Sequence, residues 1–350
     1  QEDPRYVPGV SCPHCHRPPE EARQAAMAAR QAALIQAATP LPGSVPYDNF
    51  RPLNVPAACD SFTLLRFLTH ILPHVPREKG LAEWEAGRLS GDDHRVIPLD
   101  APLRAGQRVL HRHPAACEPD VNAAIELLHE DEALIVLNKP APLPMHPGGR
   151  YNRNTLHHIL HQAFHPLKPR PAHRLDANTT GVVVLTKTRH FAGRLQPQFT
   201  RGEVEKRYLA RVHGHPAQDR FECAAAIADE PGKLGTRSID AGGLPALTRF
   251  AVLRRFADGT PLLEAQPLTG RTNQIRLRLP HAVHTIVGDP AYSHTAGATV
   301  QTHDIADQPL CLHSASLTLR HPVSGERLTF TAPPPAWALI HQSSSSSNDE

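Results

Sequence analysis

Cysteine, lysine and long apolar runs are scarce in this chain of 350 residues. Its six cysteines are too few for a disulfide scaffold, which suggests an intracellular, reducing compartment, either the cytoplasm or an organelle. Because no run of about 18 apolar residues occurs, we expect no membrane span. The formal net charge of only +3 excludes a strongly basic, histone-like nucleic-acid binder.

The positive charge that is present comes mainly from arginine. Six of the 37 Lys+Arg residues are lysine, and all the others are arginine. The planar guanidinium suits phosphate groups and base edges. However, a GC-rich genome, which also enriches Ala and Pro, is the leading explanation of the excess, and a nucleic-acid partner is the alternative.

Composition divides the chain into four parts. Residues 1–56 are typical of a tail and linker, because an Ala- and Gln-rich helical run leads into a stretch rich in proline and glycine. Residues 57–114 make a small module, and residues 115–340 make the largest domain. The Ser-rich residues 341–350 have nothing to bury and are predicted to be disordered.

Helical periodicity predicts two short helices and a small hairpin in residues 57–114. Apolar side chains recur at helical spacing between Phe62 and Leu72, a second helical stretch holds Trp84, and a strand-like segment follows at 103–110. This layout resembles a degenerate alpha-L RNA-binding module. A structural helical cap is the alternative.

Short strands alternate with short helices in residues 115–340. Apolar or β-branched runs at 133–138 and 182–187 predict buried strands, and hairpins are predicted around Asp258-Gly259 and Ser324-Gly325. Many hairpins and few crossovers predict an α+β fold with a mixed, largely antiparallel sheet and flanking helices.

One carboxylate stands out in the segment His173-Arg174-Leu175-Asp176, which precedes a small polar turn and a buried strand. At a strand entrance, Asp176 can face a cleft in which a neighbouring cation favours its ionised form. The alternative is an Asx-turn, in which Asp176 hydrogen-bonds its own backbone.

Two further segments carry candidate site residues. Arg271 and Arg276 lie on a glycine turn that leads into a predicted helix, whose N-terminus favours anions. Tyr208 lies with Lys206 on a predicted strand that also carries other cations. Taken singly, each has an ordinary alternative, namely solvent-exposed arginines and a half-buried packing tyrosine.

Several short segments between residues 122 and 337 occur together in one order. The specific ones are His173–Gly181, then Gly270–Arg276, then Gly288-Asp-Pro-Ala-Tyr292. The remaining ones are Leu134–Pro140, Met145–Pro147, Lys206–Tyr208 and Leu312–His313. This series resembles the RluA-type pseudouridine synthases. The resemblance implies the pseudouridine synthase fold and an RNA-modifying enzyme that detaches uracil from its ribose and rejoins it through carbon.

The resemblance also implies a role for each site residue. Asp176 falls on the nucleophile, and Arg174 falls on the arginine that helps to displace the target nucleotide from its stack. Tyr208 falls on the tyrosine that stacks on the flipped base and assists proton removal, and Arg276 falls on the arginine that pairs with the catalytic carboxylate. Base flipping fits this chemistry, because an enzyme reaches a base only outside the stack.

The remaining predicted RNA contacts are Lys206, Arg271, Asn273 and Arg150. Asn273 stands where the family commonly has histidine, so we expect altered RNA contacts and retained chemistry. Arg150 lies in Pro147–Leu156, a segment similar to members of the family that act on transfer RNA. We therefore expect an anticodon-arm uridine of tRNA as the target, in preference to ribosomal RNA (rRNA).

The first residues of the chain contain Cys12-Pro-His-Cys15-His16. Two cysteines at this spacing are half of a four-cysteine zinc site, and a covalent haem attachment is the alternative. Together with the helical run that follows, the segment resembles the C-terminal end of rhodanese-domain tRNA uridine hydroxylases. This resemblance, and a first residue that is Gln1 and not Met, predict a fragment of a fusion between two RNA-modifying units.

His157 and His161 lie four residues apart on a predicted helix and can form one edge of a metal site, but no matching carboxylate motif accompanies them. We therefore expect no metal site on this helix, and we expect no cofactor. The leading hypothesis is a monomeric RNA pseudouridine synthase that acts on structured RNA. The alternatives are a catalytically silent RNA-binding protein and a metal-dependent hydrolase built on this helix.

Overall fold

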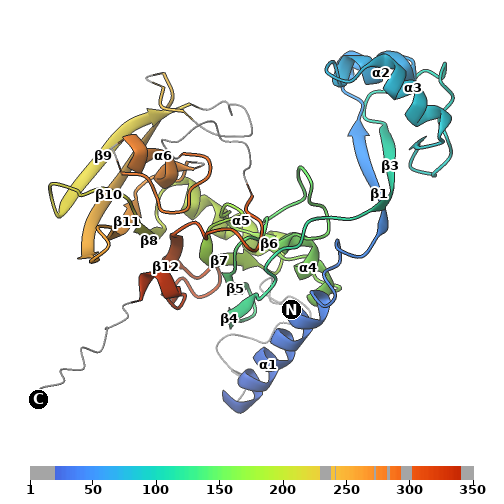
Figure 1. Cartoon of the computed structure of the whole chain (residues 1–350). Helices are drawn as coiled ribbons and strands as arrows, with labels where there is room; N and C mark the ends of the chain where they lie inside the picture. Colours follow the sequence, from blue (N-terminus) through green and yellow to red (C-terminus); the bar gives the residue numbers. More distant parts are fainter. Residues whose placement is uncertain are drawn as a thin grey trace, which may run out of the picture. The chain divides into compact units, whose positions relative to one another are not determined.

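A computed structural model describes residues 20–228, 238–240, 242–271, 273–281, 284–292 and 302–339. The chain divides into two compact units, residues 43–118 and a larger unit made of Gln1–Pro42 together with Pro119–Glu350 (Figure 1). Cys12, Cys15 and the Ser-rich tail lie outside the described residues. In the described part, no helix combines the length and the apolar character needed to cross a membrane.

The smaller unit packs two helices against a three-stranded sheet. The helices are α2 (Leu64–Ile71) and α3 (Arg77–Glu85), and a short 3-10 turn, η1, spans Ala57–Cys59. The strand order is β1-β3-β2, formed by β1 (Tyr47–Asn54), β3 (Arg108–Ala116) and β2 (Leu89–Ser90). Their buried side chains form one apolar core, which includes Leu64, Phe67, Leu103 and Val109.

The small unit starts earlier than the predicted boundary at residue 57. Residues 47–54, predicted as linker, pair with β3 along their whole length. They form an edge strand in which only Asn49 is buried, and Pro52 is tolerated there. Without a buried apolar face, such a strand has the composition of a linker.

The larger unit is built on a ten-stranded sheet. Its main order is β4-β5-β7-β12-β8-β11-β10-β9, with β13 beside β12 and β6 beside β7. The strands are β4 (Glu126–Glu130), β5 (Leu134–Lys139), β6 (Arg170–Pro171), β7 (Thr180–Thr186), β8 (Glu205–Arg211), β9 (Arg220–Ile227), β10 (Leu244–Arg255), β11 (Pro261–Pro267), β12 (Leu312–Arg320) and β13 (Arg327–Thr331). Only the β7–β12 pairing is parallel among these strands, so the predicted mixed, largely antiparallel sheet is confirmed.

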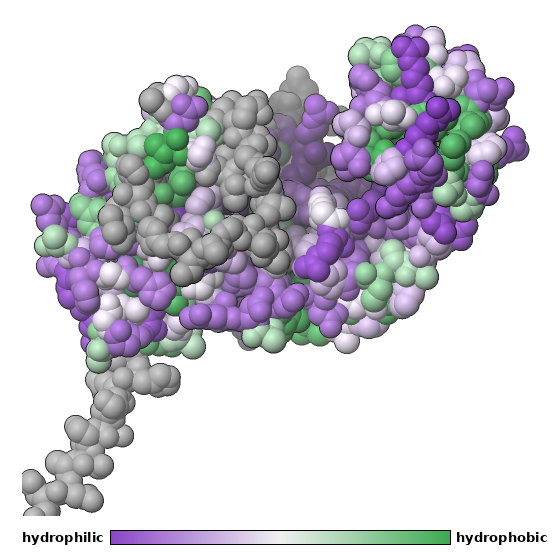
Figure 2. Space-filling model, turned by 45° about the horizontal axis from the view of Figure 1, so that its top comes forward, coloured by the Kyte–Doolittle hydropathy of each residue, from purple (hydrophilic) through white to green (hydrophobic). Residues whose placement is uncertain are grey.

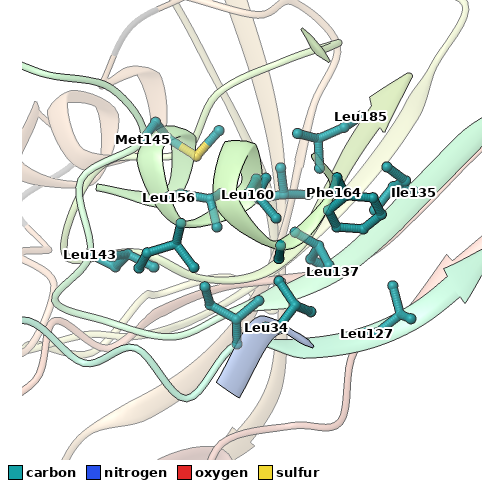
Figure 3. Packing of buried hydrophobic residues seen from close by; sticks show 14 of the residues in the cluster. Leu34, Leu127, Ile135, Leu137, Leu143, Met145, Leu156, Leu160, Phe164 and Leu185 are labelled. Carbon is teal, nitrogen blue, oxygen red and sulfur yellow. The ribbon is translucent and has the colours of Figure 1, made fainter. Parts of the chain in front are cut away.

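Helices α4 (Leu156–Ala163), α5 (Arg189–Thr200) and α6 (Gln274–His281) flank this sheet, and a short 3-10 turn, η3, spans Ala336–Ala338. The largest apolar cluster lies between α4 and strands β5 and β7 (Figure 3). The face seen in Figure 2 is mostly hydrophilic where the structure is described, with apolar residues in small separate groups. The α+β prediction is confirmed.

Helix α1 (Glu20–Ala37) belongs to the larger unit, although the sequence placed it in a tail. It lies against α4, and Leu34 is buried in the same core as Leu160 and Phe164 (Figures 1 and 3). The side chain of Gln31 donates to the Ile125 carbonyl at 2.8 Å and accepts from the Leu127 amide at 2.8 Å. Because Leu34 is the one buried residue of α1, the helix has no clear apolar face from which its packing against α4 could be predicted.

Candidate active site

One cavity of about 570 Å³ gathers segments that are far apart in the sequence. Its walls come from the turn before β7, the end of α5, strand β8 and the segment that leads into α6. The predicted site residues that line it are Asp176, Tyr208, Arg276, Arg174, Arg271, Lys206 and Asn273. Organic ligands occupy pockets of roughly 300–1,000 Å³, so a flipped nucleotide fits this volume.

Asp176 stands on the turn between β6 and β7. The Thr179 amide donates to the main-chain carbonyl of Asp176 at 3.1 Å, so the backbone closes this turn. The carboxylate, whose side chain is 25% exposed, accepts instead from Arg276. The geometry therefore favours a carboxylate directed into the cavity over the Asx-turn alternative.

Glycine is required where this turn enters β7. Gly181 has φ +108° and lies beside Ser314, where β7 and β12 run parallel. A Cβ atom at this position would lie 2.2 Å from the Ser314 carbonyl oxygen. The close approach of two strands thus explains why glycine follows the polar turn of Asp176.

Arg276 joins two carboxylates. Its Nε and Nη2 donate to the two oxygens of Asp289 at 2.9 and 2.7 Å, and its Nη1 donates to Asp176 Oδ2 at 3.2 Å. Arg276 and Asp289 are almost fully buried, with side chains 6% and 1% exposed. Burial opposes the charge, but the hydrogen bonds to Asp289 and the attraction of Asp176 outweigh it and raise the pKa of Arg276. The guanidinium is therefore a fixed positive charge beside Asp176.

Asn273 contacts the same carboxylate, although we expected it to contact RNA. With its amide nitrogen facing Asp176, it donates to Oδ2 at 2.8 Å and Oδ1 at 3.2 Å, and its oxygen accepts from the Tyr292 hydroxyl at 3.2 Å. Asn273 has φ +56°, a left-handed conformation that asparagine adopts more readily than most residues. The structure thus places Asn273 among the groups that hold Asp176.

Tyr208 lies on β8 and faces the cavity in a half-buried position. Burial raises its pKa to about 12, with a further increase from the negative charge of Asp176. The phenol is therefore neutral near pH 7. Its ring can stack on a base. Because the hydroxyl is protonated, it can accept a proton from a substrate only if it donates its own proton to another group.

Three of the four remaining predicted cations line the cavity. Arg174 and Arg271 are exposed, and Lys206 is buried with its amine donating to the Thr269 carbonyl at 3.3 Å. Burial lowers the pKa of Lys206. Arg150 is exposed but does not line the cavity. The cavity thus carries more cationic than anionic groups, which suits a phosphate-bearing ligand.

Lys139 and Asp289 are functional candidates to which sequence reasoning assigned no role. Lys139 is fully buried at the end of β5, and its amine donates to the carbonyls of Pro140, Leu143 and Ala177 at 2.9, 3.0 and 3.1 Å. Burial lowers the pKa of Lys139 to about 7. The three carbonyl acceptors favour the protonated ammonium, which has an N–H group for each of them. The bond to Ala177 fixes the residue after Asp176. Both residues lie in segments that the sequence shares with the pseudouridine synthases, at 134–140 and 288–292, and this shared pattern is the signal that could have identified them.

His173 links the turn that carries Asp176 to strand β7 and helix α5. Its Nε2 accepts from the Val184 amide at 3.0 Å, and its ring stacks on Phe199 with centroids 5.1 Å apart. Burial, and to a smaller extent the charge of Lys206, lowers the pKa of His173 to about 3. The imidazole therefore stays a neutral acceptor that ties the Asp176 segment to β7.

No group of three or more His, Cys, Asp or Glu side chains is arranged to hold a metal ion within the described ranges. His157 and His161 lie together on α4, with ring centroids 4.0 Å apart, and neither lines the cavity. The metal-dependent hydrolase hypothesis thus gains no support from the geometry.

Comparisons with known proteins point to one family. A family model described as RNA pseudouridylate synthase matches residues 133–281. An uncharacterized RNA pseudouridine synthase of Synechocystis is 32% identical over 284 residues, which cover 77% of this chain and 85% of that protein. The dual-specificity RNA pseudouridine synthase RluA of Pasteurella multocida is 31% identical over 222 residues, which cover 62% of this chain and 96% of that protein.

A solved structure has the same fold. Human RNA pseudouridylate synthase domain containing 1 superimposes with a TM-score of 0.50 and 26% identity, covering 60% of this chain and 84% of that chain. The chain therefore belongs to the RluA-type family of RNA pseudouridine synthases, which are isomerases that act on RNA.

Proposed function

We propose that this protein isomerises a specific uridine in structured RNA, with Asp176 as the nucleophile. The observation that carries the proposal is the contact between Asp176 and Arg276, at 3.2 Å, inside a cavity that Tyr208 also lines. Asp289 holds the guanidinium through two further hydrogen bonds. A nucleophile, a fixed cation and an aromatic platform therefore converge on one ligand-sized space.

The target nucleotide must leave its stack to reach this cavity. Extrusion costs a few kcal/mol, least where the base is already unpaired. Stacking on the Tyr208 ring recovers about 1–3 kcal/mol, and exposed Arg174 at the opening is placed to hold the displaced strand. The proposed order is therefore flipping, stacking on Tyr208 and attack by Asp176.

The reaction needs no added atoms. The bond between the ribose and the ring nitrogen breaks, a bond between the ribose and a ring carbon forms, and that carbon loses its proton while the nitrogen gains one. Attack by Asp176 divides this into two easier steps through a covalent intermediate. We propose that the monomeric chain carries it out without a cofactor, with Tyr208 assisting the proton transfer.

We propose a transfer RNA as the substrate, in preference to ribosomal RNA. The support is the segment Pro147–Leu156, which resembles family members that act on tRNA, and the exposure of Arg150 within it. Pseudouridine mapping of total RNA with and without the gene tests this choice. Loss of a single site in an anticodon arm is expected, and loss confined to ribosomal RNA would contradict it.

Replacing Asp176 by Asn tests the nucleophile. The change removes a charge and keeps the shape, so RNA binding is expected to persist while isomerisation falls at least about a thousandfold. Asp258→Asn is the control, since Asp258 is an exposed partner of Arg211 outside the cavity. If wild type and Asp176→Asn bind RNA equally and neither forms pseudouridine, the alternative of a catalytically silent binder is correct.

We also propose that residues 43–118 contact RNA. Arg77 and Lys79 are exposed on the first turn of α3, and neither has a carboxylate partner among the described residues. Replacing both by Ala is expected to weaken binding to bulk transfer RNA and to reduce its dependence on salt. Unchanged binding would favour the structural-cap alternative.

The fusion with a second RNA-modifying unit also remains a proposal. It is supported by the resemblance of the N-terminal segment with Cys12 and Cys15, which lie outside the described residues. A full-length transcript tests it. The transcript is expected to encode an upstream rhodanese-like segment with two further cysteines, and one that lacks this segment would contradict the proposal.

A further inference from the structure

Helix α4 presents two different faces. Leu156, Ile159, Leu160 and Ala163 are buried in the core, as the leucine side chains in Figure 3 show. Residues four apart share one side of a helix, so His157 and His161 lie together on another face. This second face has no part in the core and none in the cavity.

Three imidazoles form a row on this surface. The His157 and His161 rings have centroids 4.0 Å apart, and the His146 ring follows at 5.8 Å from His157. His146 is exposed, and the other two are half-buried. We call these residues the imidazole row. Such a row of flat rings is the kind of surface on which unpaired bases stack.

The groups that act on this row are cationic. Burial first, and then the positive charge of Arg174, lowers the pKa of His146. Burial, followed by Lys168 and Arg170, lowers the pKa of His161. The charge of Arg174, which lines the cavity, therefore acts on one end of the row, and the charges of Lys168 and Arg170, farther along the chain, act on the other end.

These cations have no counter-charge among the residues that the structure describes. In the part of the chain that the structure describes, Arg150, Lys168, Arg170 and Arg174 are all exposed and none makes an ion pair. On strands β8 and β10, by contrast, several arginines form ion pairs. They are Arg207, Arg249 and Arg255, with Glu264, Glu222 and Asp219 as partners. Unpaired cations beside flat rings are complementary to a polyanion that carries bases.

A metal ion does not fit this surface. A zinc site needs three or four ligands, and no carboxylate or third ligand completes the histidine pair on α4 in the described residues. The neighbouring charges are all positive and repel a divalent cation. The surface therefore suits an anion with aromatic groups better than a metal.

We infer that the imidazole row is a second RNA contact, which holds the strand that flanks the target uridine between Arg174 at the cavity and Lys168 with Arg170 beyond. This inference rests on the proposed function, since it assigns a place to the rest of the same RNA. Bases stack on the rings, and the cations neutralise phosphates of the same strand.

Equilibrium binding of a fluorescein-labelled, single-stranded oligouridylate tests the inference. His157→Ala combined with His161→Ala is expected to raise Kd about tenfold, since each base–aromatic contact is worth about 5- to 150-fold. Lys168→Ala combined with Arg170→Ala is expected to lower the slope of log Kd against log salt by about 1.4, or 0.7 for each phosphate contact. Both exposed cations can be removed without disturbing the core.

The control is His190→Ala, because His190 is exposed at the far end of α5 from Phe199 and Thr200, which line the cavity. Its Kd is expected to stay within twofold of wild type. Wild-type Kd and wild-type salt slope in both double variants would overturn the inference. Binding needs no catalysis, so this result is independent of whether Asp176 forms pseudouridine, and failure of the proposed function is seen separately in the isomerisation assay.

Discussion

The buried pair of Arg276 and Asp289 makes the sharpest prediction about this site. Asp289→Asn keeps the size of the side chain but removes its charge. One carboxylate oxygen becomes an amide nitrogen, so a guanidinium N–H that now donates at 2.7 or 2.9 Å would face another donor. Arg276 would then lose the contact that aims its Nη1 at Asp176.

The magnitude follows from burial. With side chains 6% and 1% exposed, the two charges have no water to replace a lost partner. Breaking a buried ion pair costs about 3–5 kcal/mol, a large part of the roughly 5–15 kcal/mol that stabilises a domain. For catalysis, a charge-assisted hydrogen bond is worth about 1.5–3 kcal/mol, so kcat is expected to fall about 10- to 150-fold.

Two measurements test this prediction. Urea unfolding is expected to show the loss in stability, and single-turnover pseudouridine formation below the unfolding transition is expected to show the loss in rate. The matched control is Asp219→Asn, because Asp219 also pairs with an arginine at 2.9 Å but is 78% exposed. Exposed pairs contribute about 0–1 kcal/mol. If Asp289→Asn matches this control in both assays, Asp289 does not hold Arg276 in place.

Three further predictions concern the turn of Asp176 and the aromatic platform. Gly181→Ala is expected to destabilise the fold by about 1–3 kcal/mol because its Cβ meets Ser314, whereas Gly193→Ala, in open space on α5, is expected to be neutral or stabilising in the same unfolding assay. Lys139→Met is expected to lower the stability of the fold by about 3 kcal/mol or more, because three buried carbonyls lose their donor. It is also expected to lower kcat, and an unaltered kcat would refute the positioning role of Lys139. Because the folded pKa of Tyr208 is about 12, above its usual 10.0, the native state holds this proton more tightly, so the associated stability is full below pH 10 and is lost as pH rises toward 12. Tyr208→Phe should remove this pH dependence, and its persistence in the variant would exclude Tyr208 as the source.

Local pattern was sufficient for the buried strands of the larger unit. The runs predicted at 133–138 and 182–187 correspond to β5 and β7, because a strand that is buried on both faces is apolar along its whole length. The same rule fails for β1, which has one buried residue and the composition of a linker. A strand can therefore be predicted from its apolar pattern only where several of its side chains are buried.

The sequence by itself determined which residues are candidates for the site. Asp176, Tyr208 and Arg276 stand in motifs whose order resembles one family, and the motif residues can be named without coordinates. Only the tertiary structure decided how they are held: Asp289 as the second partner of Arg276, and Lys139 behind the turn. The reason is physical. Sequence pattern reports which face of an element is buried, but the partner of a buried charge is fixed by packing between segments that fold together from distant parts of the chain.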